Sequence, residues 1–263
     1  MERPNSSKQA FALVCGASQG LGRAIAEQFA LERKNLFLLA RGEETLQALS
    51  RELKEKGAPA AYAIAADLND FADAAEKVQH LIMEKGVVSI LINNTGGPAP
   101  GPVLTADIAA FQEAFQRHLL ASHALLQIVL PGMKAIGFGR IINIISTSVR
   151  EPIENLGVSN TIRGAVAAWS KSVANELPPG ITINNILPGY TETPRLELLK
   201  EKISGATGIS KEEVVNNWKQ SVPEKRLGRP EEIAQAVSFL VSPSASYIRG
   251  VSLAVDGGRM RSI

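Results

Sequence analysis

Three glycines within seven residues are the first feature of this sequence whose residue types and spacing suit chemistry. They directly follow the apolar run that ends at Cys15, and a longer amphipathic stretch begins within them. Glycines let a backbone approach a phosphate closely, and a helix N-terminus offers unpaired N–H groups and partial positive charge. This placement predicts a pyrophosphate-binding turn. Its expected binding residues are Gly16, Ser18, Gln19, Gly20, Leu21 and Gly22.

Such a turn requires a strand before it and a helix after it, and the chain repeats this alternation along its length. Short apolar runs, each followed by an amphipathic stretch, are typical of βαβ units with a parallel sheet covered on both faces. Gly57 and Gly86 stand where two helices should stop, and Pro230 stands where a late helix should begin. The expected strands are residues 11–15, 36–40, 61–65, 87–92, 140–145, 182–187 and 251–255.

Residues 194–228 interrupt this alternation, because they carry no strand signal and contain Gly205, Gly208 and Pro223. We interpret them as short helices inserted after the sixth strand. An insertion near the carboxyl ends of strands suits a lid over a substrate, and a surface excursion without a role is the alternative. No linker or repeat occurs elsewhere, so we expect one domain over residues 1–263.

Composition excludes several classes of protein and of partner. The formal net charge is only +2 and no basic run is present, so we expect no nucleic acid partner. The single cysteine rules out an intrachain disulfide, and no segment has the ~18–20 uninterrupted apolar residues that cross a bilayer. We expect a cytoplasmic protein without a membrane partner. His80 and His123 have no second ligand at metal-binding spacing, so no metal is expected.

The glycine spacing G-x-x-x-G-x-G resembles that of the short-chain dehydrogenase/reductase family, and further matches continue the resemblance across nearly the whole chain. Asp67 resembles the family's adenine-contacting acid, and Asn93 begins an Asn-Asn-Thr-Gly sequence similar to its Asn-Asn-Ala-Gly motif. Residues 188–193 resemble its Pro-Gly-x-x-x-Thr loop at the nicotinamide, and residues 255–258 its C-terminal signature. The resemblance adds these expected cofactor-binding residues: Asp67, Asn93, Pro188, Gly189 and Thr193.

The resemblance also implies the architecture. We expect an α/β fold made of a single doubly wound Rossmann-type domain. Its seven-stranded parallel sheet has the order 3-2-1-4-5-6-7, with helices on both faces.

The end of the second expected strand bears on the choice between NAD(H) and NADP(H). An acidic side chain there would hydrogen-bond the ribose diol of NAD and repel a 2′-phosphate. This chain has Ala40 followed by Arg41, whose guanidinium offers forked donors that match phosphate oxygens. We therefore predict NADP(H) rather than NAD(H). The alternative is that Arg41 only lies in solvent at the strand end.

The sequence departs from the family at the residues that catalyse the reaction. Ser146 matches the serine that polarises the carbonyl, but Ser159 stands in place of the family's tyrosine proton donor. Arg163 stands in place of the lysine four residues later, and no Tyr-x-x-x-Lys occurs anywhere in the chain. A serine hydroxyl is a far weaker acid than a tyrosine hydroxyl, so Ser159 cannot simply replace it. Arg163 keeps the positive charge and can bind ribose hydroxyls, so we expect cofactor binding to survive.

Proton transfer then needs another donor, and His118 is our candidate. It takes the position of the family's asparagine, and an imidazole with an ordinary pKa of ~6.5 suits neutral pH. A histidine on a helix face without any chemistry is the alternative. Tyr190, beside the nicotinamide loop, is a weaker candidate. Cys15 ends a buried strand, so we give it no catalytic role.

We therefore expect an NADP(H)-dependent oxidoreductase that acts on a small carbonyl or alcohol, similar to the 3-oxoacyl-carrier-protein reductases. The alternative is a protein that binds NADP(H) without turnover and has a regulatory role. The expected catalytic set is atypical and comprises Ser146, Ser159, Arg163 and His118.

The expected partners are a small-molecule substrate and further copies of the same chain. Relatives commonly form homotetramers or dimers through helices that here begin near Asp107 and near Ser159, so we expect a homo-oligomer. The basic residues Arg195, Lys200 and Lys202 suit either the attraction of an acidic substrate or a solvated helix face.

Overall fold

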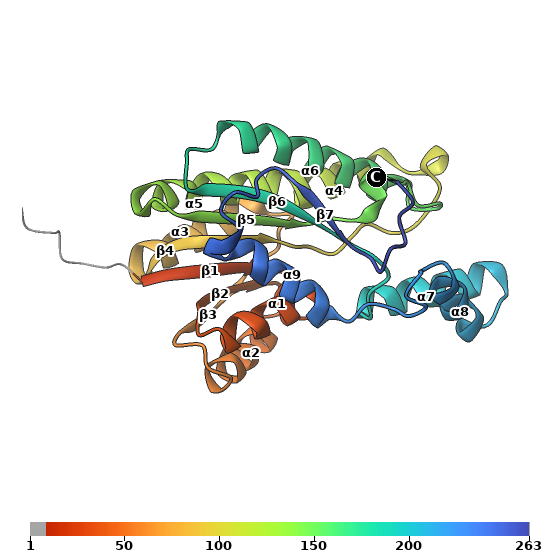
Figure 1. The fold of residues 1–263 in the computed structure, drawn as a ribbon, viewed down its shortest axis with the longest axis horizontal. Helices are drawn as coiled ribbons and strands as arrows, with labels where there is room; N and C mark the ends of the chain where they lie inside the picture. The colour runs from red at the N-terminus through yellow and green to blue at the C-terminus, as the bar shows by residue number, and fades with distance from the viewer. Residues whose placement is uncertain (1–8, 263) are drawn as a thin grey trace, which may run out of the picture.

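A parallel sheet of seven strands forms the centre of the computed structural model, which describes residues 9–262. The strands are β1 Gln9–Cys15, β2 Asn35–Ala40, β3 Ala61–Ala65, β4 Gly86–Asn93, β5 Gly139–Ile144, β6 Ile181–Pro188 and β7 Ser252–Val255. Their order is β3-β2-β1-β4-β5-β6-β7 (Figure 1), which confirms the predicted doubly wound fold. Every predicted strand is present, with boundaries within two residues of the prediction.

Helices cover both faces of this sheet. They are α1 Gly20–Leu31, α2 Glu43–Glu55, α3 Phe71–Lys85, α4 Ile108–Phe115, α5 Ala121–Ile136, α6 Gly157–Glu176, α7 Pro194–Thr207, α8 Lys211–Gln220 and α9 Pro230–Val241. Short turns are η1 Val103–Thr105, η2 Gln116–Leu120, η3 Thr147–Val149 and η4 Pro243–Ala245. Helices α1, α2 and α9 pack on one face, and α3, α5 and α6 pack on the other. The sheet therefore separates two hydrophobic cores.

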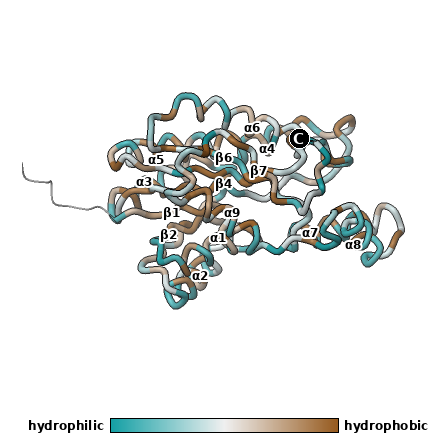
Figure 2. The backbone as a smooth tube through the Cα atoms, in the orientation of Figure 1, coloured by the Kyte–Doolittle hydropathy of each residue, from teal (hydrophilic) through white to brown (hydrophobic). Residues whose placement is uncertain are grey.

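Strand β1 shows how the sequence builds these two cores. Successive side chains of a strand point to opposite faces of its sheet. Ala12 and Val14 therefore pack in the core under α1, α2 and α9, while Phe11 and Leu13 pack in the core under α3, α5 and α6. Because both faces are covered, every position of the strand interior is apolar, and the central strands appear hydrophobic in Figure 2 while much of α2 is hydrophilic.

The junction between α3 and β4 requires a glycine, as the sequence predicts. Gly86 ends α3 with φ +148°, and a Cβ there would lie 2.2 Å from the carbonyl oxygen of Gln9 at the start of β1. This close approach lets β4 pair with β1 from its first residue. Their adjacency creates the switch point of the sheet, where the winding direction reverses and ligand sites of such folds lie.

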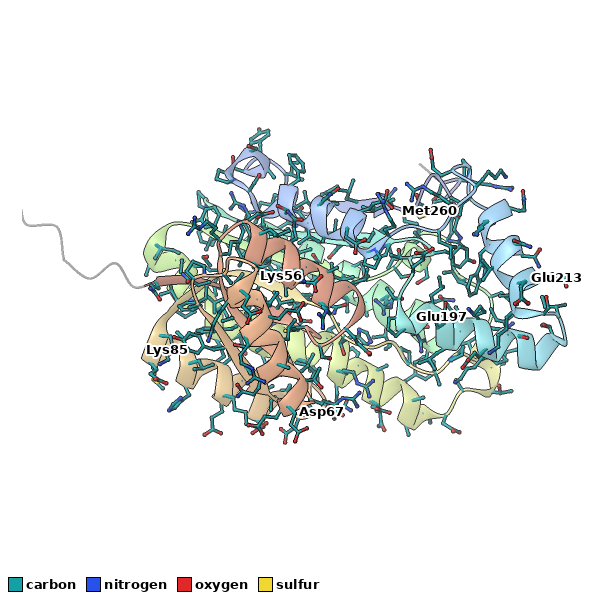
Figure 3. All side chains as sticks on the ribbon, turned by 90° about the horizontal axis from the view of Figure 1, so that it is seen from below. Lys56, Asp67, Lys85, Glu197, Glu213 and Met260 are labelled. Atoms are coloured by element: carbon teal, nitrogen blue, oxygen red, sulfur yellow. The ribbon has the colours of Figure 1, made fainter. Side chains whose placement is uncertain are left out.

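The loops after the strands all open toward one end of the molecule. Lys85, directly before β4, lies at the opposite end from Met260, which follows β7, and from Glu197 on α7 (Figure 3). Helices α7 and α8 project from the sheet at this end (Figure 1). They have a small core of their own around Trp218, which agrees with the helices expected within residues 194–228.

One long helix results from the continuous run of α4, η2 and α5 over Ile108–Ile136. Its mean hydropathy is 1.4 in the most apolar window, of which only 33% is buried. By length and composition alone, it is the one helix among residues 9–262 long and apolar enough to cross a membrane. We expected no uninterrupted apolar segment of that length. Charged residues do interrupt this segment, but the π-helical turn η2 keeps the helix itself continuous.

Candidate active site

A cleft of 1120 Å³ runs along the carboxyl ends of the strands. It is lined by the loops after β1 to β6 and by one side of α7. The cleft brings together most of the residues predicted to bind a cofactor, and Gly22 and Asn93 are the two that do not line it. Those that line it are Gly16, Ser18, Gln19, Gly20, Leu21, Arg41, Asp67, Arg163, Pro188, Gly189 and Thr193.

The glycine turn has the geometry that an anion requires. Gly16 and Gly20 adopt φ values of +60° and +57°, which favour glycine. A Cβ at Gly22 would lie 2.1 Å from the carbonyl oxygen of Gly16, so Gly22 lets helix α1 pack against the turn. The side chain of Gln19 does not cap α1, and no acidic residue lies in its first turn. The N–H groups at the start of α1 are therefore available, and a pyrophosphate fits here.

The end of β2 forms a second part of the cleft that suits a phosphate. Ala40 and Arg41 both line the cleft, and Arg41 is exposed. Within residues 9–262, Arg41 forms no salt bridge, so its charge is not neutralised by a neighbouring carboxylate. Asp67 lies in the same cleft, where its Oδ1 accepts a 3.0 Å hydrogen bond from the backbone N–H of Asn69.

The two asparagines after β4 have different environments, and the sequence alone did not separate them. Asn93 is the last residue of β4 and is buried, whereas Asn94 lines the cleft. The side chain of Asn94 donates hydrogen bonds of 3.2 and 3.4 Å to the carbonyl oxygens of Cys15 and Gly16, which hold the glycine turn. We predicted Asn93 as a cofactor-binding residue, but its side chain is buried and points away from the cleft, toward Asn143 on the neighbouring strand β5.

Asn93 instead begins a ladder of buried amides across the sheet. Its Nδ2 donates a 2.8 Å hydrogen bond to Oδ1 of Asn143, and Nδ2 of Asn143 donates one of 2.8 Å to Oδ1 of Asn185. Asn185 in turn donates to the hydroxyl of Ser252 at 3.0 Å. These residues are in register on β4, β5, β6 and β7. The ladder therefore joins β4, β5, β6 and β7 through side chains as well as through their backbones.

Ser146, Ser159 and Arg163 line the same cleft. Ser146 lies two residues after the end of β5, and its Oγ accepts a 3.1 Å hydrogen bond from the N–H of Ser148. Ser159 and Arg163 lie one turn apart on α6, and Nε of Arg163 donates a 3.2 Å hydrogen bond to Oγ of Ser159. Nη1 of Arg163 donates to the carbonyl oxygens of Ile144 and Ile145 at 3.2 and 2.6 Å. The guanidinium is thus held beside the residue that precedes Ser146.

The guanidinium of Arg163 stays charged despite its surroundings. Desolvation lowers the pKa of Arg163 to about 10, and the positive charge of Arg195 acts in the same direction. A pKa of about 10 leaves the group protonated at neutral pH. Arg163 therefore supplies positive charge and hydrogen bonds to the cleft, but no proton.

His118 lies below the cleft rather than in it. It belongs to the π-helical turn η2, is 5% exposed and lines an adjoining cavity of about 10 Å³, which shares Asn94 and Arg117 with the cleft. Desolvation, followed by the charges of Arg163 and Arg117, lowers the pKa of His118 well below 6.5, although a hydrogen bond with the backbone of Gly96 acts in the opposite direction. We proposed His118 as an acid because of the ordinary pKa of imidazole, but burial lowers that pKa, and the side chain is neutral at pH 7.

Tyr190, the weaker candidate for the proton donor, lines the cleft. The ring of Tyr190 stacks on Trp218 with centroids 5.2 Å apart, and the guanidinium of Arg259 lies 4.8 Å from its centroid. Burial raises the pKa of Cys15 to about 12, so its thiol is inert at neutral pH.

Arg195 is a site residue whose role the sequence left open between solvation and anion attraction. It follows Pro194 at the start of α7, and its Nη2 donates a 2.7 Å hydrogen bond to the carbonyl oxygen of Pro98, across the cleft. Lys202 also lines the cleft, whereas Lys200 is paired with Glu197 on the helix surface.

With this geometry in place, comparison with known proteins identifies the family. A family model described as "Enoyl-(Acyl carrier protein) reductase" matches residues 16–259, which is nearly the whole chain. The chain belongs to the short-chain dehydrogenase/reductase family. The resemblance of its sequence motifs to that family is thereby confirmed, and with it the expected class of oxidoreductase that acts on carbonyl or alcohol groups.

Several relatives in the short-chain dehydrogenase/reductase family match over almost their full length. The NADPH-dependent reductase BacG of Bacillus subtilis (strain 168) is 32% identical over 254 residues, which cover 96% of this chain and 98% of BacG. The 3-oxoacyl-[acyl-carrier-protein] reductase FabG of Vibrio harveyi is 33% identical over 250 residues, covering 94% and 96% of the two chains.

Solved structures of short-chain dehydrogenase/reductase proteins superpose closely on the chain. YwfH, an NADPH-dependent reductase involved in bacilysin biosynthesis, has a TM-score of 0.90 at 31% identity, with 98% of this chain and 100% of that chain covered. A variant of the actinorhodin polyketide ketoreductase with NADPH has a TM-score of 0.91 at 30% identity, with 98% and 99% covered.

Proposed function

We propose that this chain is an NADP(H)-dependent reductase of a small carbonyl compound, and that Ser146, Ser159 and Arg163 form its catalytic set. The observation that carries the proposal is the hydrogen bond from Arg163 to Ser159 in the cleft that Ser146 also lines. It keeps a charged donor and a hydroxyl at the positions where the family has lysine and tyrosine. The named relatives and structural neighbours that are NADPH-dependent support the choice of cofactor.

The residues that would hold NADP(H) line one continuous cleft. The glycine turn and the start of α1 suit the diphosphate, and Arg41 suits the 2′-phosphate in place of the acid that would prefer NAD(H). Asp67 stands at the adenine side, while Pro188, Gly189, Thr193 and Arg163 stand at the nicotinamide side, as the family resemblance implies. Bound NADPH supplies the hydride for the reduction.

Ser146 and Arg163 stabilise the oxygen of the substrate. The Oγ of Ser146 accepts its hydrogen bond from Ser148, so its own proton is free to be donated to a carbonyl oxygen. Negative charge grows on that oxygen as the carbonyl is reduced, and the permanent charge of Arg163 stabilises it. Such preorganised stabilisation of an oxyanion is usually the largest contribution to catalysis of this kind.

Ser159 delivers the proton that completes the alcohol. Because Oγ of Ser159 accepts a hydrogen bond from Arg163, its own O–H is free to point into the cleft. Because a serine hydroxyl is too weak an acid to act alone, Ser159 serves as a relay: as its proton passes to the substrate alkoxide, a proton from solvent in the open cleft replaces it in the same step. His118 is neutral and does not line the cleft, so we assign it the positioning of η2 and not the donation of the proton.

Binding of NADP(H) without turnover is the second candidate function. It is favoured by the contacts of Arg163 with the carbonyl oxygens of Ile144 and Ile145, which use part of its donor capacity, and by the weak acidity of Ser159. A fluorescence titration with NADPH, followed by ketones, aldehydes and 3-oxoacyl thioesters while NADPH oxidation is recorded, separates the two. Turnover that Ser159→Ala and Ser146→Ala reduce supports the reductase. NADPH binding without oxidation by any compound supports the regulatory protein.

We further propose that the chain forms a homo-oligomer, a dimer or a tetramer, through η1, α4 and α6. Large apolar side chains are exposed there, with Leu104 94% and Ile108 76% exposed, and Phe115 is exposed on the same helix as Ile108. Light scattering after size exclusion should give a multiple of the 28.1 kDa chain mass, and Ile108→Glu should shift it toward the monomer. A monomeric wild-type protein would contradict this.

A further inference from the structure

Two guanidinium groups converge on one point of the cleft. Gly97 lies in the loop after β4, and an ideal Cβ on it would be 3.4 Å from Nη2 of Arg163 and 3.4 Å from Nη2 of Arg195. The two nitrogens are therefore separated by no more than twice that distance. Arg163 comes from α6 and Arg195 from α7, so the pair closes only in the folded protein.

Both groups are held in place by neutral oxygens. Arg163 donates to Ser159 and to the carbonyl oxygens of Ile144 and Ile145, and Arg195 donates to the carbonyl oxygen of Pro98. Within the described part of the chain, neither arginine forms a salt bridge with a carboxylate. The pKa of each guanidinium is lowered, mainly by desolvation. Two positive charges held this close repel each other, and an anion bound between them would stabilise the pair.

The absence of a side chain at Gly97 leaves room for such an anion. The position of its missing Cβ is in reach of both guanidiniums, and the forked donors of arginine match the oxygens of a carboxylate. Arg163 also contacts the carbonyl oxygen of Ile145, which directly precedes Ser146. A carboxylate bound by the arginine pair would thus place a nearby carbonyl group of the same molecule beside the hydroxyl of Ser146.

We propose that the substrate is an oxo acid, and that Arg163 and Arg195 bind its carboxylate while Ser146 binds its carbonyl oxygen. This proposal rests on the reductase function proposed above and narrows its substrate class. The cofactor diphosphate is the other anion that could occupy the pair. The glycine turn already provides a separate diphosphate site at the start of α1, which favours the substrate.

The test compares an acid with its neutral ester in wild-type protein and in Arg195→Gln. Lys200→Gln is the matched control, because it removes one positive charge from the same helix without touching the cleft. For 3-oxobutanoate, kcat/KM should fall ~30-fold in Arg195→Gln, the loss expected for one charge-assisted hydrogen bond. For methyl 3-oxobutanoate, kcat/KM should change less than ~3-fold, as should the Kd of NADPH, and Lys200→Gln should behave as wild type.

A second variant keeps both charges and fills the space between them. Gly97→Ala places a Cβ at ordinary contact distance from both Nη2 atoms, so the fold tolerates it while the gap narrows. Gly97→Ala should also lower kcat/KM for 3-oxobutanoate more than kcat/KM for its methyl ester. Equal losses for acid and ester in both variants would overturn the proposal. If the only effect is weaker binding of NADPH, the arginine pair binds the cofactor diphosphate, and the proposal is also overturned.

Binding without turnover separates this proposal from the proposed function. Butanoate and butanamide are titrated by calorimetry into the protein saturated with NADPH. Tighter binding of butanoate, lost in Arg195→Gln and kept in Lys200→Gln, supports the carboxylate site even if no compound is reduced. Equal binding of both compounds, or binding of neither, would overturn the site while leaving any observed reductase activity intact.

Discussion

Arg163 and Ser159 lie one helical turn apart on α6, and the Nε–H of Arg163 donates a 3.2 Å hydrogen bond to the Ser159 hydroxyl oxygen. The arginine therefore occupies an acceptor site of the hydroxyl and leaves its proton free. The same guanidinium also binds the carbonyl oxygens at the end of β5. One side chain thus connects the end of β5, just before Ser146, with the helix that carries Ser159.

Removal of the Arg163 charge should abolish most of the catalysis. Arg163→Met is expected to lower kcat/KM ~100- to 1000-fold, because it removes oxyanion stabilisation in the desolvated cleft. Arg163→Lys keeps the charge, so its kcat/KM should fall less than that of Arg163→Met. Steady-state kinetics with the best carbonyl substrate measures both. Unchanged kcat/KM in Arg163→Met would show that the reaction does not use this charge.

The preference for NADPH should depend on Arg41. Arg41→Ala should weaken NADPH binding ~10-fold or more, since a charge-assisted contact with the 2′-phosphate is lost, and should leave NADH binding within ~2-fold. Fluorescence titrations give both dissociation constants. Arg51→Ala is the control, because Arg51 is exposed on α2 and does not line the cleft. If Arg41→Ala weakens the binding of NADPH and NADH equally, Arg41 does not bind the 2′-phosphate.

Burial of His118 should make the stability of the fold depend on pH. In the unfolded chain the imidazole takes up a proton near pH ~6.5, whereas in the native state its pKa lies well below that value. Below pH ~6.5 the unfolded chain therefore binds more protons, and the free energy of unfolding falls as the pH decreases, by at most ~1.4 kcal/mol per pH unit for this group.

Urea unfolding of wild type and of His118→Gln between pH 5 and pH 7.5 isolates this effect. The difference in free energy between the two proteins should narrow as the pH falls, because the variant has no imidazole to protonate on unfolding. A constant difference across this range would mean that His118 keeps an ordinary pKa. The same variant should keep kcat within ~3-fold at pH 7 if His118 only positions η2.

The amide ladder should stabilise the sheet. Asn143→Leu leaves Nδ2 of Asn93 without its acceptor and Oδ1 of Asn185 without its donor, at a cost of about 2–4 kcal/mol in the free energy of unfolding. Chemical denaturation measures this loss. Asn217→Ala, at an exposed position on α8, should cost less than ~0.5 kcal/mol. A loss for Asn143→Leu as small as the control would show that the ladder is not stabilising.

Local patterns of the chain were sufficient for the strands and for the junctions between elements, whereas the strand order was predicted from the family resemblance. The short, continuously apolar runs specify strands of a sheet covered on both faces, and Gly86, Pro230 and the glycine turn mark the junctions between elements. These are short-range features, since each depends on residues within a few positions of one another. Arg163 and Ser159 could likewise be placed together from their spacing of one helical turn.

Which side chains share a space was decided only by the folded chain. The sequence placed His118 at a catalytic position, yet the π-helical turn buries it in a small cavity beside the cleft, where desolvation and then the charges of Arg163 and Arg117 lower its pKa. Asn93 and Asn94 are adjacent and alike, but strand alternation sends one into the sheet and the other to the glycine turn. Arg163 and Arg195 stand 32 positions apart and meet only because β6 and the start of α7 bring them across the cleft. Desolvation and charge depend on such long-range neighbours, and these exist only after the sheet has assembled.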